Sequence, residues 1–364
     1  MGLIRLLLAI AVLNSHFTVS GLPMVRGHEA VLAFFAISGF YMALILDTRY
    51  ASARRFYLSR FLTLYPAYVL AVAVAIGLLI SFDIHPMTSR AELSRLLSDP
   101  TAFLVMAWTS LGVVGQELLF CLSQAPEGGL QFIPAARDSI WHSAPLIQGW
   151  SLSLEIMFYA LAPLMVRLRS RTLVGLACAS LALRLAVPLA GPENVLFFKR
   201  FFPLELWTFA GGILAYRLHK RLPAMPGGMA DYAAFAALAA TVLLAGWTPE
   251  PAKPYLMPAV VMTTMPFVFR SFGRFRFDRF VGKLSYPFYL FHYSVVAVFE
   301  TTADAPEGWE ILLVSLSAAL VVHALFEPGL ETLKRRLRGR AHPVLTDLTP
   351  PDLGPPASPP VATR

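Results

Sequence analysis

Long apolar runs recur along the whole chain, and they restrict it to a membrane-spanning architecture. Hydrophobic residues make up 57% of the 364 residues and charged residues only 14%, whereas a soluble globular chain carries about 25% charge. A run of about 17 to 25 apolar residues is long enough to cross a bilayer as a helix. The sequence therefore predicts an all-α, polytopic membrane protein that has the lipid bilayer as its surroundings and no nucleic acid as a partner.

Eleven apolar runs are candidates for crossing the bilayer. They cover residues 3–19, 29–46, 60–82, 101–121, 150–166, 172–190, 201–218, 231–248, 255–270, 282–302 and 309–327. Arginine clusters follow two of these runs, at Arg49, Arg54, Arg55 and Arg60 and at Arg167, Arg169 and Arg171. The positive-inside rule places both clusters in the cytoplasm, so the chain between 83 and 149 begins and ends outside. The run 101–121 is therefore expected to be a re-entrant or interfacial segment rather than a crossing.

The remaining ten runs predict a bundle of about ten transmembrane helices with both chain ends in the cytoplasm. In this topology 22 of the 30 Lys and Arg residues lie inside and 8 lie outside or near the outer surface. We expect one membrane domain over residues 1–340 and a proline-rich, disordered cytoplasmic tail over 341–364. A cleavable signal peptide is the alternative for the first run, but Asn14 and His16 have no use in such a segment.

The first run carries two ionisable residues, Arg5 and His16, that are costly at membrane depth. They lie eleven positions apart, which is just over three turns of a helix and about 16 Å along its axis. Both side chains are then expected on one face of the helix. A snorkelling arginine and an interfacial histidine are the alternative for either residue alone, but the shared face favours a functional role for the pair.

Polar residues also lie inside later runs. Glu155 falls about one turn into the run that starts at Trp150, a candidate interfacial anchor, with Ser153 beside it. We expect this carboxylate to pair with His16 at the same outer depth, or else to bond neighbouring backbone. His292 lies halfway through its run among aromatic residues, where a core and a functional role are equally consistent with the sequence. Ser38 and its glycine neighbour favour close helix packing.

Basic residues precede the third run in the stretch "ARRFYLSRFLTLYPAY". Arg54, Arg55 and Arg60 either set the topology or, clustered at the mouth of a polar bundle, bind an anionic ligand with several phosphates. Two more ionisable residues, Arg184 and Glu205, occur at similar depth in consecutive runs, and a structural ion pair is expected there.

Taken together, these stretches resemble the acyltransferase-3 family, the ten-span membrane O-acyltransferases of bacteria that modify cell-surface carbohydrates. The resemblance covers about residues 3–340 and rests on the Arg5-to-His16 spacing, "FFAISGF", "RRFYLSRFLTLYPAY", "WSLSLE", "FFPLELWTFAGGILAY", "LSYPFYLFHYS" and "FEPGLETLKRR". The chain departs from the family's usual pattern around Arg5, where "GLIRLL" replaces an Asp-Gly-Leu-Arg-Gly stretch, and at Phe291 and Ser294, where Trp and Pro are usual. These departures bear on substrate preference.

The resemblance implies an enzyme of the bacterial inner membrane that transfers an acyl group, usually acetyl, from cytoplasmic acyl-CoA to a hydroxyl of a carbohydrate or glycolipid. His16 is then the general base, Glu155 orients it, and Arg5 with Arg54, Arg55 and Arg60 holds the donor. Ser38, Ser153 and His292 are further binding candidates. Direct transfer and a covalent acyl-enzyme remain open alternatives.

No tightly bound cofactor is expected. Acyl-CoA, in the first instance acetyl-CoA, is expected to serve as the donor substrate. The two cysteines, Cys121 and Cys178, lie far apart in separate apolar segments. Neither a disulfide framework nor a thiolate metal site is therefore expected.

A transporter or flippase for a lipid-linked sugar or exported glycan is the main competing function. It would use the same buried charges as a permeation path. Paired helices broken by glycine or proline at matching positions of two halves are the better sequence pointer to a transport site, and we find no such pair. A non-catalytic scaffold accounts poorly for Arg5, His16 and Glu155 together.

Overall fold

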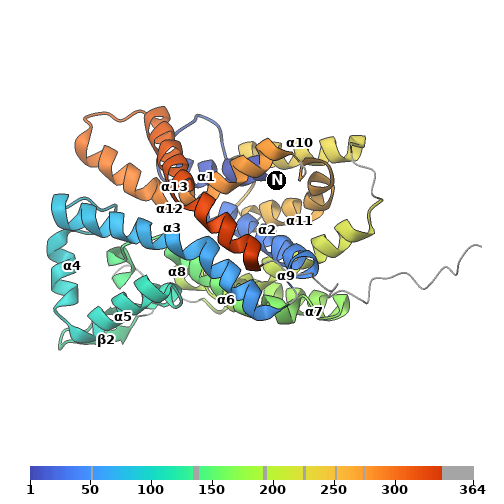
Figure 1. Cartoon of the computed structure of the whole chain (residues 1–364). Helices are drawn as coiled ribbons and strands as arrows, with labels where there is room; N and C mark the ends of the chain where they lie inside the picture. Colours follow the sequence, from blue (N-terminus) through green and yellow to red (C-terminus); the bar gives the residue numbers. More distant parts are fainter. Residues whose placement is uncertain are drawn as a thin grey trace, which may run out of the picture.

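The computed structural model describes residues 1–50, 52–133, 139–191, 195–223, 227–250, 252–273 and 275–337. Within these ranges the chain is almost entirely helical, and its sheet has two short antiparallel strands, β1 (Leu122–Gln124) and β2 (Leu130–Phe132). The predicted all-α class is confirmed (Figure 1). The expected tail at 341–364 lies outside the described residues.

Each of the ten expected spans corresponds to one long helix. These helices are α1 (Gly2–Asn14), α2 (Gly27–Thr48), α3 (Ala53–Phe82), α6 (Gly149–Met165), α7 (Ser170–Ala186), α9 (Phe202–Arg221), α10 (Met229–Leu244), α11 (Lys253–Phe272), α12 (Arg276–Thr302) and α13 (Gly308–Leu337). Five segments of the described chain are long and apolar enough to cross a membrane, and they lie in α2, α3, α7, α10 and α13. The protein is therefore a membrane protein of helical type, and the full count of ten crossings remains a prediction.

Helix α1 is shorter than the sequence predicts. The run 3–19 was expected to be one helix, but α1 ends at Asn14 and His16 lies in the turn that follows. The Asn14 side-chain oxygen accepts hydrogen bonds from the backbone N–H groups of Val19 and Ser20, at 3.0 and 2.9 Å. An asparagine that bonds nearby backbone in this way offers an alternative to the helical pattern. The expectation that Arg5 and His16 share one helix face is therefore wrong.

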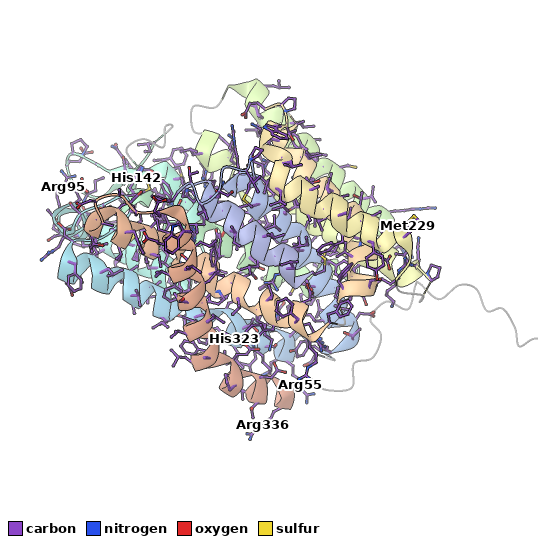
Figure 2. The ribbon with its side chains drawn as sticks, turned by 90° about the horizontal axis from the view of Figure 1, so that it is seen from above. Arg55, Arg95, His142, Met229, His323 and Arg336 are labelled. Atoms are coloured by element: carbon purple, nitrogen blue, oxygen red, sulfur yellow. The ribbon has the colours of Figure 1, made fainter. Side chains whose placement is uncertain are left out.

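The segment between α3 and α6 forms a separate small module. It contains α4 (Arg90–Leu97), α5 (Pro100–Gly112), the two strands and two 3-10 turns, η1 (Gln116–Cys121) and η3 (Ile140–Ser143). Figure 1 shows α4, α5 and β2 together at the end of α3 where residue 82 lies. In Figure 2, Arg95 and His142 of this module lie at the opposite end of the molecule from Met229, the first residue of α10. This arrangement is consistent with the expected topology.

The run 101–121 is not one helix. Helix α5 has 13 residues and rises about 20 Å, which is short of the roughly 30 Å hydrocarbon core. Its last residues meet the middle of α3, where the hydroxyls of Tyr65 and Tyr68 donate to the carbonyls of Leu111 and Ser110 at 2.8 and 2.7 Å. The chain then turns back through η1. This path agrees with the expected re-entrant or interfacial segment.

Helix α2 is the central element of the bundle. Of its most apolar window 78% is buried, compared with 17–28% in the other four candidate spans. Its closest partner is α9, and the two helices meet through one glycine from each side. A methyl group added at Gly39 would lie 2.1 Å from the Phe209 carbonyl oxygen, and one added at Gly212 would lie 2.0 Å from that of Ala36. Backbone thus packs directly on backbone, as small residues allow between membrane helices.

The glycine contact leads to a stability prediction. Gly39→Ala should push α2 away from α9 and destabilise the protein by about 1–3 kcal/mol, the usual cost of overpacking. Thermal unfolding of the purified protein in detergent measures the change. Gly77→Ala in α3 is the matched control, because an added methyl group there has nothing within 4 Å. Equal melting temperatures for the two variants would contradict this account of α2–α9 packing.

The topology leads to a labelling prediction. Cysteines placed at Glu127, which is exposed, and at Arg137, which lies outside the described residues, should react with an impermeant thiol reagent added to intact cells. A cysteine at the exposed Arg55 should react only after lysis. Protection at Glu127 and Arg137 in intact cells would mean eleven crossings or the opposite orientation.

Candidate functional site

A cavity of about 340 Å³ opens between helices α1, α2, α3, α6, α12 and α13. Five cationic side chains line it, and they outnumber the three carboxylates there: the cations are Arg5, Arg49, Arg60, Lys283 and Lys334, and the carboxylates are Glu155, Glu327 and Glu331. Under the expected topology these residues belong to the cytoplasmic half of the bundle. The cavity is therefore electropositive at the side from which a cytoplasmic anion would enter.

Two of the lining arginines have no carboxylate partner. The Arg5 guanidinium carbon lies 6.0 Å from the Tyr41 ring centroid, and its Nε atom is buried without a hydrogen-bond partner. Arg60 donates from Nη2 to the Ser59 hydroxyl at 3.2 Å, and its Nε is likewise buried and unpartnered. Among the described carboxylates, none forms an ion pair with either arginine. The sequence predicted both residues as anion ligands, and the structure brings them into one cavity.

The other two predicted arginines do not join them. Arg54 and Arg55 are exposed on the first turn of α3 and do not line the cavity. Figure 2 shows Arg55 near Arg336, at the end of the molecule where α13 finishes. Helix period explains the split, because residues five or six positions apart face different directions. The expected three-arginine cluster is therefore reduced to Arg60.

Cations that the sequence did not single out take their place. Lys283 begins the "KLSYPFYLFHYS" stretch and pairs with Glu327 of α13 at 2.6 Å, while Lys334 lies 3.9 Å from the same carboxylate. Tyr286, Tyr289 and Tyr293 follow Lys283 at helical spacing. That spacing of Lys and Tyr at i, i+3, i+6 and i+10 is the sequence signal that could have identified this face of α12.

Glu155 and Ser38 meet on the wall of the cavity. The Ser38 hydroxyl and the Tyr159 hydroxyl both donate to one oxygen of the Glu155 carboxylate. The predicted contact between Glu155 and His16 is absent from the described structure, because the Glu155 carboxylate faces the cavity and His16 lies in the turn after α1. Glu155 thus belongs to the wall of the cavity rather than to the surroundings of His16.

His16 instead joins a cluster with α12. The Tyr293 hydroxyl lies 2.8 Å from both His16 ring nitrogens, and the two ring centroids are 4.5 Å apart. The His292 ring lies 4.5 Å from that of Tyr293 and 5.9 Å from that of His16. Two histidines that the sequence selected from opposite ends of the chain therefore share one polar cluster, and Tyr293 is the contact that sequence reasoning missed.

His292 has a defined tautomer and a free nitrogen. Its Nδ1 atom lies 2.7 Å from the Tyr289 carbonyl oxygen, which only accepts hydrogen bonds, so Nδ1 carries the proton. Its Nε2 atom then carries a lone pair, and it is buried without a partner. A neutral imidazole held in this way can accept a proton. His292 is thus a second candidate base rather than a satisfied core residue.

Polar residues connect the cavity to this cluster. Tyr289 and Gln148 both line the cavity, and the Tyr289 hydroxyl lies 2.7 Å from that of Ser151. The Gln148 amide donates to the Leu290 carbonyl at 2.8 Å. The Tyr289 ring centroid lies 5.6 Å from that of His292. A polar seam along α6 and α12 therefore runs from the cationic cavity to the histidines.

The structure bears on three further sequence predictions. The Ser153 hydroxyl accepts from the Gly115 N–H at 3.0 Å and donates to Glu117 at 2.5 Å, so it anchors the turn after α5 and does not line the cavity. Trp150 is buried within the protein, and its place relative to the membrane interface stays a prediction. The expected ion pair between Arg184 and Glu205 is confirmed.

The fold and site together define a helical membrane protein with an electropositive cavity on one side of a histidine cluster. A family model described as an acyltransferase domain, that of the acyltransferase-3 family, matches residues 1–326. The chain belongs to this family, which indicates a membrane acyltransferase and agrees with the resemblance seen in the sequence. No curated protein and no solved structure matches the chain significantly. Within the described ranges there is no group of three or more His, Cys, Asp or Glu residues able to hold a metal ion.

The cavity geometry separates the roles of the three predicted arginines. Arg60→Gln should weaken acyl-CoA binding by about tenfold or more, because it removes a positive charge that no described carboxylate neutralises. The double variant Arg54→Gln with Arg55→Gln should change the binding less than twofold. A tenfold change corresponds to about 1.4 kcal/mol. Binding of an acyl-CoA to the purified protein at low and high salt is the measurement, and binding should weaken as salt rises. If the double variant loses binding and Arg60→Gln keeps it, the exposed loop rather than the cavity holds the donor.

Proposed function

We propose that this protein transfers an acyl group, in the first instance acetyl, from cytoplasmic acyl-CoA to a hydroxyl of a cell-surface or exported carbohydrate in the inner membrane. The observation that carries the proposal is the polar seam between the unpaired arginines of the cavity and the histidine cluster. A donor whose phosphates are bound at the cavity arginines would direct its thioester toward the histidine cluster.

The donor side follows from charge. The phosphates of CoA are multivalent anions, and Arg5 and Arg60 are cations of the cavity with no carboxylate of their own. Guanidinium groups bind phosphate through paired hydrogen bonds, which suits them to this task. Ser38, Tyr159 and Glu155 lie deeper along the same wall, where the pantetheine arm and its thioester would pass.

The chemistry needs one proton acceptor near the incoming hydroxyl. The hydroxyl oxygen attacks the thioester carbonyl carbon, a C–O ester bond forms and the C–S bond breaks. The hydroxyl proton moves to an imidazole and from there to the leaving thiolate of CoA. His16 is the preferred base, because it lies in an exposed turn at the outer ends of the helices, where an acceptor arrives. Tyr293 holds its ring, the role first expected of Glu155.

The test is acyl transfer itself. Cells that carry the protein should acylate a surface or exported glycan, and NMR of that glycan identifies the hydroxyl. His16→Ala should abolish transfer at equal expression, and Glu155→Gln should reduce it strongly through the donor side. His142→Ala, in the small module, is the control and should keep activity. Activity should also fall as the pH drops below the pKa of the base, because a protonated imidazole accepts no proton.

Two outcomes would redirect the assignment. Near-wild-type transfer by His16→Ala would move the base to His292, whose free Nε2 is the alternative. A glycan that crosses the membrane with no acyl group gained, in a protein-dependent way, would show a transporter or flippase instead.

A further inference from the structure

A third half-buried arginine, Arg200, has no carboxylate partner among the described residues. Arg200 occupies the turn between α8 (Val195–Phe198) and α9. Its Nη1 donates to the Leu196 carbonyl at 2.9 Å, and its Nε is buried without a partner. No described carboxylate lies within ion-pair distance of it. The carboxylate of Glu205, whose charge also acts on Arg200, is bonded to Arg184.

Flat aromatic groups hold this arginine in place. The Arg200 guanidinium carbon lies 4.4 Å from the Phe120 ring centroid and 4.7 Å from that of Trp150. Trp141 stacks on Phe120 at 4.4 Å, and His28 stacks on Trp150 at 6.0 Å. Five planar groups therefore form one column, with the guanidinium between two rings. This stacking fixes its orientation, and its Nε has no hydrogen-bond partner.

The charge of Arg200 acts on Tyr293, the residue that contacts the predicted base His16. His28 follows Gly27 at the start of α2, and a methyl group added at Gly27 would lie 3.5 Å from the His16 Nε2 atom. Both ring nitrogens of His28 are buried without a partner. Positive charge gathers here, since Lys199 precedes Arg200 and both charges act on His28. Burial lowers the pKa of Arg200 to about 10, so the guanidinium remains charged at neutral pH.

We infer that Arg200, held between Phe120 and Trp150, binds an oxyanion of the acceptor, so that the acceptor is an acidic carbohydrate or a phosphate-bearing one rather than a neutral sugar. Calling the ligand an acceptor rests on the proposed function. The anion site itself is argued only from the contacts of Arg200. A buried cation with no protein anion is costly unless an anion arrives with the ligand. A purely structural clamp is the competing role, because the same stacking joins η1, α6 and the turn before α9.

The test measures ligand preference directly. The purified full chain in nanodiscs is titrated with D-glucuronate, D-glucose and inorganic phosphate, and binding is followed by tryptophan fluorescence, since Trp150 contacts Arg200. Wild type should bind glucuronate or phosphate at least tenfold more tightly than glucose. A higher affinity for phosphate than for glucuronate identifies a phosphate-bearing acceptor, and a higher affinity for glucuronate identifies an acidic sugar. Equal binding of all three probes by the wild-type protein would overturn the inference, and this result does not depend on whether any variant folds.

Variants separate recognition from clamping. Arg200→Gln should bind glucuronate, phosphate and glucose equally, while Lys199→Gln, at the exposed neighbouring cation, should keep the preference. Arg200→Lys should keep it at several-fold lower affinity, because lysine retains the charge without the planar fork. A folded Arg200→Gln protein that still prefers the anions overturns the inference. Acyl-CoA binding is measured in the same samples, and its absence in wild type would count against the proposed function without changing the anion titration.

Discussion

A cationic side chain inside an apolar helix bundle needs an anion to compensate its charge, and the rest of the structure depends on this constraint. Most buried or half-buried charges of the described chain meet it internally, as Arg184 does with Glu205 and Arg270 with Asp231. Arg5, Arg60 and Arg200 do not. Because an uncompensated charge at membrane depth costs several kcal/mol, these three mark the places where a ligand's charge completes the structure. Arg5 and Arg60 line the cavity, and Arg200 lies between the Phe120 and Trp150 rings.

The central helix makes this arrangement possible. Helix α2 packs on α9 through Gly39 and Gly212, backbone against backbone, and this fixes the bundle behind the cavity. On its other side α2 presents Ser38 to Glu155 of α6 and Tyr41 to Arg5 of α1. At its N-terminal end Gly27 leaves room for Ser15 and His16. One rigid element therefore carries contacts to the cationic cavity, to the proposed base and, through His28, to the aromatic column.

The local sequence pattern predicted the helices and several residues that line the cavity. It failed where contacts between segments far apart in the sequence determine the structure. The sequence singled out Arg5 and Arg60 as charges at the ends of apolar helices, and both line the cavity. It could not foresee that Asn14 bonds Val19 and Ser20, which ends α1 before His16. It could not foresee Tyr293 as the partner of His16, 277 positions away. The sequence did not identify Arg200 as a candidate site residue, because its stacking partners lie in η1 and α6. No spacing pattern in the sequence predicts that these segments meet.

The turn at Asn14 changes how the two halves of the site relate mechanically. Had the first helix continued to residue 19, Arg5 and His16 would form one rigid rod, and any tilt on donor binding would move the base with it. With the helix ended, His16 is carried by the turn of residues 15–26 and held by Tyr293 of α12. Under the proposed function, the arginine that would hold the donor and the histidine that would accept the proton can then adjust independently, each to its own substrate.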